Sequence, residues 1–350
     1  MGGLPFTSPH QAALSIAFLS VELSPRLRYG YDYKSKRRYT ERSYPMPSER
    51  KTEGILMPMP VAFKQDGAID YKATDAIIDF YLDAGVHGFF PLGTHGQGMV
   101  MEIDERKKVA EHIVQRVKGR VPIVMHIGTA NTLSSIDLAK HAVSLGVDAI
   151  GVVPPYYYPH DDWEVYAHYK AIARSVPGTP MFIYDNTETT WVEITPAKAN
   201  RIIEEIAPNP LAGIKVSFIP YDKLLGYVYQ LPKSVGVFPG GIFNLYTGYS
   251  VGVRGAIHPP STPFPETCVK MYEALKAGDL KGAQKEHDLL TRLMQVVGKY
   301  LRTHGRGVFC ELMKLRGLPV ERFPRWETPP FTEKDRADLK NGLEQAGFKA

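Results

Sequence analysis

Eight short apolar runs alternate with amphipathic stretches between residues 54 and 258 of this 350-residue chain. Apolar runs without polar alternation are typical of parallel strands that are buried on both faces. The stretches between them carry apolar residues at helical spacing, as Val109, Ile113 and Val117 do. The expected strands are 54–63, 87–93, 121–127, 148–153, 180–185, 211–216, 235–240 and 253–258.

This alternation predicts an α/β fold, a closed (β/α)8 TIM barrel with a C-terminal helical region. A doubly wound open sheet would show the same alternation of strands and helices. However, no Gly-x-Gly-x-x-Gly follows the first strand, so the sequence gives little support to a dinucleotide-binding sheet. We therefore expect a barrel over 53–278 and a helical region over 279–350.

Helix-boundary signals agree with this division of the chain. Thr195 and Pro196 are expected to be the N-cap and first residue of one helix, and Thr132 or Ser134 the N-cap of another. The expected helices are 104–118, 132–145 and 195–207 within the barrel, and 279–302, 306–317 and 333–346 after it.

The first 45 residues differ from the rest of the chain. Their seven Lys/Arg and three acids give +4 of the net charge of +5, and they lack sustained periodicity. A secretory signal is disfavoured because no positive charge precedes the apolar run at Ala12. We favour a mis-assigned start with translation from Met46, with a transit peptide or a disordered tail as alternatives. Residues 1–52 are therefore expected to be an unstructured or mis-annotated extension.

Composition excludes several classes of protein. The body of the chain is nearly neutral, so it offers no basic face for nucleic acid. No apolar stretch approaches the ~18 residues that a transmembrane helix needs. The two cysteines, Cys268 and Cys310, cannot build a disulfide framework and suit a reducing compartment, so we expect a cytoplasmic protein.

Lys215 is the most informative candidate for chemistry, because it lies at the end of an apolar strand with no acid beside it in sequence. Burial in a barrel would lower its pKa, and a neutral amine can attack a ketone to form a Schiff base. The alternatives are a lysine that reaches solvent at the barrel mouth and one paired with a distant carboxylate. From this residue alone, the functional and structural interpretations are equally supported.

Two other strand ends carry suitable groups. Tyr184 ends the preceding strand, so its phenol is expected to reach the Lys215 amine and to relay a proton; a core tyrosine is the alternative. The glycines of GTHGQG (93–98) allow backbone N–H groups to face a carboxylate, with Thr94 and His95 as additional hydrogen-bonding groups. A tight strand-to-helix turn explains this loop equally well.

Several motifs in this order resemble the dihydrodipicolinate synthase / N-acetylneuraminate lyase family. They are GTHGQG, PPYYY, FIYDN, AGIK and PGG, together with the opening GILMPMPVAFKQDGAID and the C-terminal KLRGLPVERFP. The resemblance covers about residues 53–348. It implies a lyase of the class I aldolase type, a homotetramer or homodimer that acts on pyruvate or another 2-keto acid through a lysine Schiff base, without a cofactor or metal.

The resemblance also assigns roles by motif position. It implies that Lys215 forms the Schiff base and that Tyr184 relays protons. The residues that it places around the substrate are Thr94 and His95 at the keto-acid carboxylate, Tyr157 from a neighbouring subunit, Gly240 of the PGG motif, and Ile257 through its backbone.

Departures from the family pattern bear on the substrate. The family's second hydroxyl residue is His95 here, its glutamate is Gln97, and the arginine that holds the second carboxylate in synthases is Thr189. Loss of a carboxylate–arginine clamp predicts weak activity as a 4-hydroxy-tetrahydrodipicolinate synthase, although authentic synthase activity stays an alternative.

A second alternative is a hydratase-aldolase that acts on aromatic ylidene-pyruvates. Tyr184-x-Asn186-x-Glu188 with Trp191 resembles that branch, in which the asparagine positions a water. The aromatic residues Tyr156, Tyr157, Tyr158 and Phe243 would then line the pocket, unless they serve packing or a subunit interface.

The residues alone leave two further alternatives. His95, His126 and His258 lie near predicted strand ends and could hold Zn²⁺ in a metal-dependent aldolase. No zinc-binding spacing supports this, and Lys215 would then have no role. A non-enzymatic keto-acid-binding protein is the other alternative; the presence of both Lys215 and Tyr184 disfavours it.

Overall fold

The computed structural model describes residues 52–217 and 219–348. The expectations for the N-terminal extension, including a start at Met46, concern residues that lie outside this part of the chain, apart from residue 52. They stay predictions, as does the division of the remainder at residue 278.

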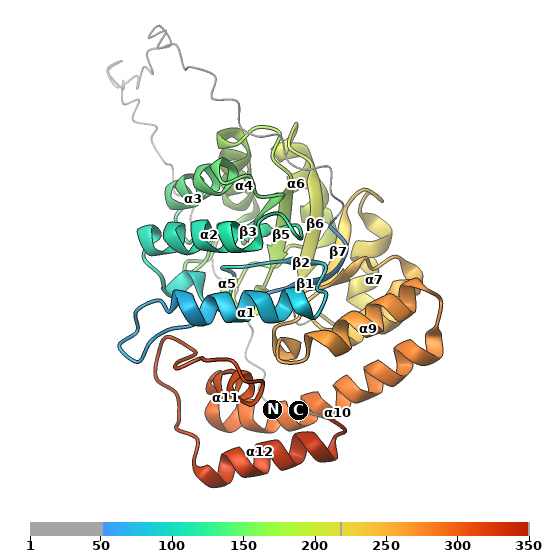
Figure 1. The fold of residues 1–350 in the computed structure, drawn as a ribbon. Helices are drawn as coiled ribbons and strands as arrows, with labels where there is room; N and C mark the ends of the chain where they lie inside the picture. The colour runs from blue at the N-terminus through green and yellow to red at the C-terminus, as the bar shows by residue number, and fades with distance from the viewer. Residues whose placement is uncertain (1–51, 218, 349–350) are drawn as a thin grey trace, which may run out of the picture. The chain divides into compact units, whose positions relative to one another are not determined.

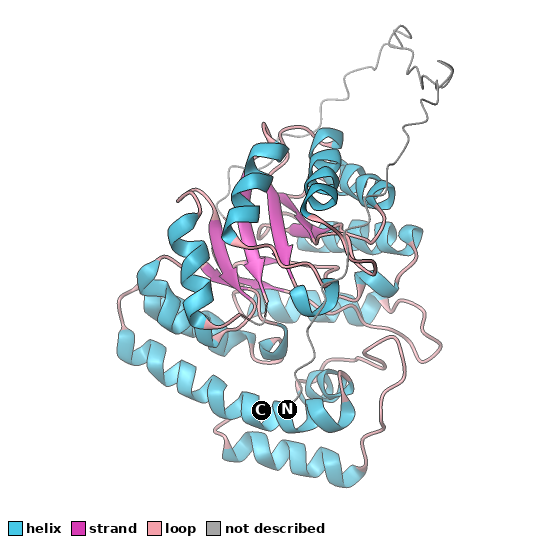
Figure 2. Ribbon diagram, turned by 180° about the vertical axis from the view of Figure 1, so that it is seen from behind, coloured by secondary structure: helices cyan, strands magenta, loops and turns pink. Residues whose placement is uncertain are grey.

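Eight strands lie at the centre of the fold and helices surround them (Figures 1 and 2). The strands are β1 Gly54–Met57, β2 Gly88–Phe89, β3 Val124–His126, β4 Ala149–Val152, β5 Met181–Asp185, β6 Leu211–Val216, β7 Gly236–Pro239 and β8 Gly255–Ala256. The barrel helices are α1 Tyr71–Asp83, α2 Ile103–Val117, α3 Thr132–Ser144, α4 Asp162–Ser175, α5 Thr187–Thr190, α6 Pro196–Ile206, α7 Tyr221–Gln230, α8 Phe243–Gly248 and α9 Pro265–Lys276.

The strand order closes the sheet on itself. β1 pairs in parallel with β2 on one side and with β8 on the other, and β3 to β7 pair in sequence order. A parallel bridge between Phe89 and Ile123 joins β2 to β3. The Arg254 N–H donates to the Val237 carbonyl over 3.1 Å and links β8 to β7. The predicted (β/α)8 barrel is therefore confirmed, and the open doubly wound sheet is wrong.

All eight expected strands are present, but β1 is shorter than the apolar run that predicts it. The strand ends at Met57, whereas the run continues to residue 63. Pro58 and Pro60 lack the N–H that a strand ladder requires, so pairing cannot continue through them. The remaining apolar residues pass through the core as an irregular segment, in which Met59 and Phe63 are fully buried.

Helix caps follow the sequence at α6 and differ from it at α3. The Thr195 hydroxyl accepts from the Lys198 N–H over 3.3 Å, with Pro196 in the first turn, as expected. At α3 the cap is Asn131, whose side chain accepts from two backbone N–H groups. The expected caps Thr132 and Ser134 lie inside the helix instead, because Asn131 already accepts from the Leu133 and Ser134 N–H groups.

Three helices follow the barrel in the described part of the chain (Figure 1), and one of them contacts the loop after β2. They are α10 Leu280–His304, α11 Gly307–Leu315 and α12 Glu333–Gln345. The ring of Phe309 on α11 lies edge-on to His95 of the barrel, with 4.9 Å between ring centroids. This contact makes the C-terminal helices part of the surroundings of the barrel mouth. Across 52–217 and 219–348, none of the helices combines the length and apolar character needed to cross a membrane.

Candidate active site

Lys215 lies near the carboxyl end of β6. In register it faces Tyr184 on β5 and Phe238 on β7. Active sites of (β/α)8 barrels lie at the carboxyl ends of the strands, so Lys215 is at the end where chemistry is expected. The structure therefore brings Lys215 and Tyr184 together, as their positions on neighbouring strands predict.

The environment of Lys215 favours a neutral amine. The residue is only 2% exposed, so its side chain does not reach solvent at the barrel mouth. Its Nζ lies 4.0 Å from the ring centroid of Tyr184 and 5.0 Å from that of Phe90. Burial lowers the pKa of Lys215, the Tyr184 phenol opposes this, and no carboxylate in the described part of the chain is among the groups that act on it. The two structural alternatives for this lysine therefore do not fit its surroundings.

Tyr184 connects Lys215 to a short chain of polar groups. Its hydroxyl lies 3.1 Å from Thr94 Oγ1, and Asn186 Nδ2 donates to the same Thr94 oxygen over 3.3 Å. Burial alone would raise the pKa of Tyr184. The positive charge of Lys215 and hydrogen bonds with Thr94, Lys215 and Ser217 outweigh burial, so the pKa of this phenol is lowered. A phenol of lowered pKa beside an amine is suited to exchange protons with it.

A cavity of about 420 Å³ opens beside these groups. Two buried polar atoms at its wall, Asn186 Oδ1 and His258 Nδ1, have no hydrogen-bond partner among the described residues. Such atoms are costly unless a ligand or water satisfies them, so the cavity is prepared for a polar ligand. Its lining comprises Thr94, Tyr184, Asn186, Glu188, Thr189, Ser217, Ile219, Gly240, Gly241, Asn244, His258, Pro259, Pro260, Leu301, Arg306 and Phe309.

The side chain of His95 is not among the groups that line this cavity. It is 2% exposed and packs between Phe309 and Phe323, and its Nε2 lies 3.1 Å from Thr262 Oγ1. Burial, reinforced by nearby positive charges, lowers the pKa of His95 well below its usual range. The imidazole therefore lies outside the lining of this cavity, and a contact between His95 and the keto-acid carboxylate stays a prediction.

The glycines of the 93–98 loop are explained by close packing. A Cβ on Gly96 would lie 2.6 Å from the Leu92 backbone nitrogen, so only glycine fits as the loop folds back. Gln97 also faces away from the cavity lining, because its Oε1 accepts from the Arg325 N–H over 2.8 Å. Both departures from the family loop, His95 and Gln97, thus contact the C-terminal part of the chain.

Of the other predicted substrate-binding residues, some lie at or near the cavity and others lie outside it. Gly240 lines the cavity, and Ile257 is fully buried in the same apolar cluster as Tyr184. Tyr157 lies outside the cavity with 80% of its surface exposed and its ring 5.1 Å from that of Tyr158. The expected aromatic lining is not formed by Tyr157, Tyr158 or Phe243; the aromatic residues at the wall are Tyr184 and Phe309.

A buried arginine that contacts the carboxyl end of β3 was missed in the sequence. Arg106 on α2 is 1% exposed and donates to the carbonyls of Gly128 and His126 over 3.0 and 2.6 Å. Its Nη2 also lies 3.1 Å from His126 Nδ1, which therefore accepts this hydrogen bond. The available signal was its position in the apolar stripe of α2, three residues before Val109, where a charged residue needs internal partners.

Replacing Arg106 with methionine is expected to lower the free energy of unfolding by about 3 kcal/mol or more, since the buried carbonyls of Gly128 and His126 would lose their donors. Chemical denaturation measures this change. The matched control is Lys108→Met, two residues along the same helix and exposed, for which a change within about 0.5 kcal/mol is expected. Equal stability of the two variants would contradict the structural role of Arg106.

The three histidines considered for a metal do not converge. His95 has Thr262 and Arg306 against its two ring nitrogens, and His126 Nδ1 accepts from Arg106. A search of the described residues finds no group of three or more His, Cys, Asp or Glu side chains placed to hold a metal ion. The geometry therefore gives no support to the metal-dependent alternative.

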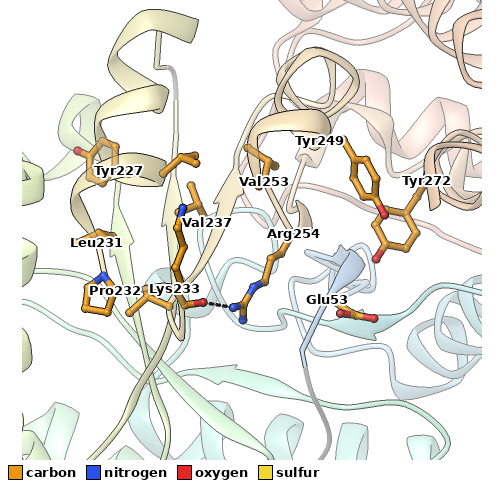
Figure 3. Close-up of a pocket in the computed structure, with 13 residues that line it drawn as sticks. Glu53, Tyr227, Leu231, Pro232, Lys233, Val237, Tyr249, Val253, Arg254 and Tyr272 are labelled. Carbon is orange, nitrogen blue, oxygen red and sulfur yellow. Dashed lines mark hydrogen bonds between the residues drawn. The ribbon is translucent and has the colours of Figure 1, made fainter. Parts of the chain in front are cut away.

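A second cavity of about 420 Å³ lies at the other end of the barrel (Figure 3). Glu53 and Arg254 directly precede β1 and β8, so the residues around this cavity belong to the amino ends of the strands. Figure 3 shows Arg254 donating to the carbonyl of Lys233, which ties it to the loop before β7. Active sites of (β/α)8 barrels lie at the carboxyl ends of the strands, so this cavity at the amino ends is a poor candidate for catalysis.

Comparison with known proteins identifies the family. The model of the dihydrodipicolinate synthetase family matches residues 51–346. The chain belongs to this family. The resemblance noted in the sequence is therefore confirmed, and the protein is an enzyme of a lyase family.

Relatives within the dihydrodipicolinate synthetase family differ in their named activities. A 4-hydroxy-tetrahydrodipicolinate synthase of Desulfotalea psychrophila is 30% identical over 79% of this chain and 90% of its own. An N-acetylneuraminate lyase of Rhizobium meliloti is 27% identical over 83% of this chain and 92% of its own. A prophage protein of this family from Escherichia coli K12, solved in complex with pyruvate, superposes with a TM-score of 0.75 at 27% identity, covering 84% and 98% of the two chains.

Proposed function

We propose that this lyase forms a Schiff base between Lys215 and a 2-keto acid, with no other cofactor, and then makes or breaks a carbon–carbon bond. The observation that carries this proposal is the pairing of a buried lysine of lowered pKa with the Tyr184 phenol at the barrel mouth. The relative solved with pyruvate supports a keto acid as the substrate class.

In this proposal, Lys215 and Tyr184 carry the proton transfers of the reaction. The neutral Lys215 amine attacks the ketone carbon, and the resulting carbinolamine loses its hydroxyl as water once Tyr184 donates a proton. Tyr184 is then a phenolate, which the Thr94 hydroxyl stabilises from 3.1 Å away. The Tyr184 phenolate takes the proton of the C4 hydroxyl as the C3–C4 bond breaks, and the bonding electrons pass toward the iminium to give an aldehyde and an enamine, which Tyr184 then protonates at C3. In the reverse direction Tyr184 removes a C3 proton, and the enamine adds to the aldehyde. Water attack on the iminium finally frees Lys215.

The remaining residues orient the keto acid in this proposal. Thr94 and the peptide groups of the 93–98 loop hold the carboxylate, while Gly240 and the backbone at Ile257 lie against the rest of the molecule. Tyr157 contributes to the site of a neighbouring subunit in a homotetramer or homodimer. Its 80% exposure supports this arrangement, because a contact with a second subunit would cover it.

Addition or removal of water at the bound substrate is a second candidate outcome, and Asn186 favours it. The amide lines the cavity, donates through Nδ2 to Thr94, and leaves Oδ1 buried without a partner among the described residues. A water that donates a hydrogen bond to Oδ1 would be oriented toward the substrate. The same Schiff base serves both outcomes, because the iminium activates C3 for loss of a hydroxyl at C4 or for cleavage.

Covalent trapping tests the proposed function. Borohydride reduction in the presence of pyruvate is expected to add one pyruvyl group, and peptide mapping by mass spectrometry should place it on Lys215. The rate of trapping is expected to fall as the pH is lowered, because protonation of the amine removes the nucleophile. An enzyme that stays unmodified at saturating pyruvate, or that carries the adduct only on exposed lysines, would overturn the proposal.

A further inference from the structure

The cavity beside Lys215 contains a cation that comes from the C-terminal part of the chain. Arg306 directly precedes α11 and lines the cavity together with Leu301 and Phe309 from the same region. Its side chain is partly buried, and it makes no ion pair with an acid anywhere in the described residues. A guanidinium offers five N–H donors, and only one of them has a hydrogen bond within this part of the chain.

His95 holds this guanidinium in place. Thr262 donates its own hydroxyl hydrogen to the Pro259 carbonyl over 2.9 Å, so it accepts the hydrogen bond from His95 Nε2. His95 Nδ1 is therefore unprotonated and accepts from Arg306 Nη1 over 3.4 Å. The lowered pKa of His95 keeps the ring neutral, so that it supports Arg306 without repelling it. His95 is a positioning residue for Arg306.

The charge of Arg306 acts on the reaction centre but has no counter-charge of its own. Its positive charge contributes to lowering the pKa of Lys215. Burial lowers the pKa of Arg306 as well, although a guanidinium stays protonated at neutral pH. Glu188 lines the same cavity but forms no ion pair with Arg306. A partly buried cation without an anionic partner is costly unless the ligand supplies the opposite charge.

The position of Arg306 indicates which end of the ligand it meets. A keto-acid carboxylate is one bond from the carbon that Lys215 attacks, so the groups that bind it must lie close to Lys215. Thr94 meets this requirement, because it contacts the Tyr184 hydroxyl and the Tyr184 ring lies beside the Lys215 amine. Arg306 donates no hydrogen bond to Lys215, Tyr184 or Thr94 in the described structure. The cavity of about 420 Å³ also has room for more than a three-carbon acid.

We propose that Arg306 binds an anionic group at the far end of the substrate, so that the enzyme selects 2-keto acids that carry a second carboxylate. This inference rests on the proposed function, which supplies the keto acid at Lys215. Two parallel N–H···O bonds from the guanidinium can hold such a carboxylate, whose charge supplies the ion-pair partner that Arg306 lacks in the described residues.

A matched pair of ligands isolates the effect of the far carboxylate. 2-Oxoglutarate and 2-oxopentanoate have the same five-carbon chain and the same 2-keto acid, and differ only at the end that Arg306 would meet. Calorimetric titration of the full-length enzyme is expected to show about 10- to 100-fold tighter binding of 2-oxoglutarate. Arg306→Gln should abolish this preference, whereas Arg306→Lys should retain part of it because the charge remains.

Two controls make the result specific. Arg302→Gln removes an exposed arginine of the same region that does not line the cavity, and should leave the preference unchanged. Arg306→Gln should lose far more affinity for 2-oxoglutarate than for 2-oxopentanoate, because only 2-oxoglutarate has the second carboxylate. Equal affinity of the parent enzyme for both ligands would overturn the inference, and so would an equal loss of affinity for both ligands in Arg306→Gln. A missing pyruvate adduct in the parent enzyme overturns the proposed Schiff base instead, since the calorimetric comparison does not depend on the adduct.

Discussion

Replacing Lys215 with methionine is expected to abolish turnover and covalent trapping by pyruvate together. Methionine is unbranched and similar in length, so packing against Phe90 and Tyr184 should be preserved while the nucleophile is lost. Removal of the buried amine also removes a desolvation cost, so the variant should fold at least as well as the parent. Steady-state assays, intact mass after borohydride treatment and thermal unfolding measure the three quantities.

Lys223→Met is the matched control for this experiment. Lys223 lies on α7, eight residues along the chain from Lys215, and its side chain is 63% exposed beside Glu193. This variant should keep both activity and trapping. If Lys215→Met retained activity, and chelators abolished it, the Schiff-base mechanism would be wrong and a metal-dependent aldolase would have to be considered again.

Replacing Tyr184 with phenylalanine is expected to reduce kcat by about 10²- to 10⁴-fold, the usual contribution of a positioned acid–base group. The ring still packs against Phe90 and His126, so the shape of the site is preserved. Thr94 and the loop that contains it are unchanged, so the apparent affinity for pyruvate should change far less than kcat. Rates of single turnover and the concentration dependence of borohydride trapping separate these two effects.

The pH dependence of this variant provides a second measurement. The ammonium–phenolate attraction that raises the pKa of Lys215 is lost with the hydroxyl, so the pKa of Lys215 should fall further. The pH below which trapping slows should therefore be lower in Tyr184→Phe than in the parent enzyme. A variant with near-normal kcat and an unchanged pH profile would show that Tyr184 serves packing alone.

The barrel could be predicted from the sequence because its signals are local. Each strand is an apolar run, each helix repeats apolar residues at helical spacing, and both patterns are read within a few residues of the chain. The meeting of Lys215 and Tyr184 follows from the same information, since consecutive strands of a barrel are neighbours and their ends lie at one edge.

The orientation of side chains in the 93–98 loop could not be predicted in this way. His95 was expected to face the substrate because it follows Thr94 at a strand end. The structure turns it toward Phe309 and Thr262, which lie more than 160 residues away in sequence. Contacts of this kind depend on how the C-terminal helices pack against the barrel, which no local pattern specifies. Arg306 was missed for the same reason, because it lies in no strand-end motif.

The helix cap at Asn131 and the buried Arg106 show a milder limitation. In both cases the deciding residue was visible in the sequence, but its local pattern did not determine its role. Asn131 precedes the expected cap Thr132 by one residue, and boundaries of helices are uncertain by about that much. Arg106 lies in an apolar stripe, where its acceptors become evident only when β3 and α2 are placed side by side.

Helix α11 and the segment before it contribute to the barrel mouth. This arrangement places the selection of the substrate and the bond chemistry in different parts of the chain. In the proposed mechanism the atoms that change bonds belong to strands β5 and β6, whereas Leu301, Arg306 and Phe309 line the same cavity from the C-terminal part of the chain. Substitutions in that short segment can therefore alter which molecules are accepted while the bond-making machinery remains intact. The same barrel can in this way accept different metabolites through changes in a few residues that lie about ninety positions after its lysine in the sequence.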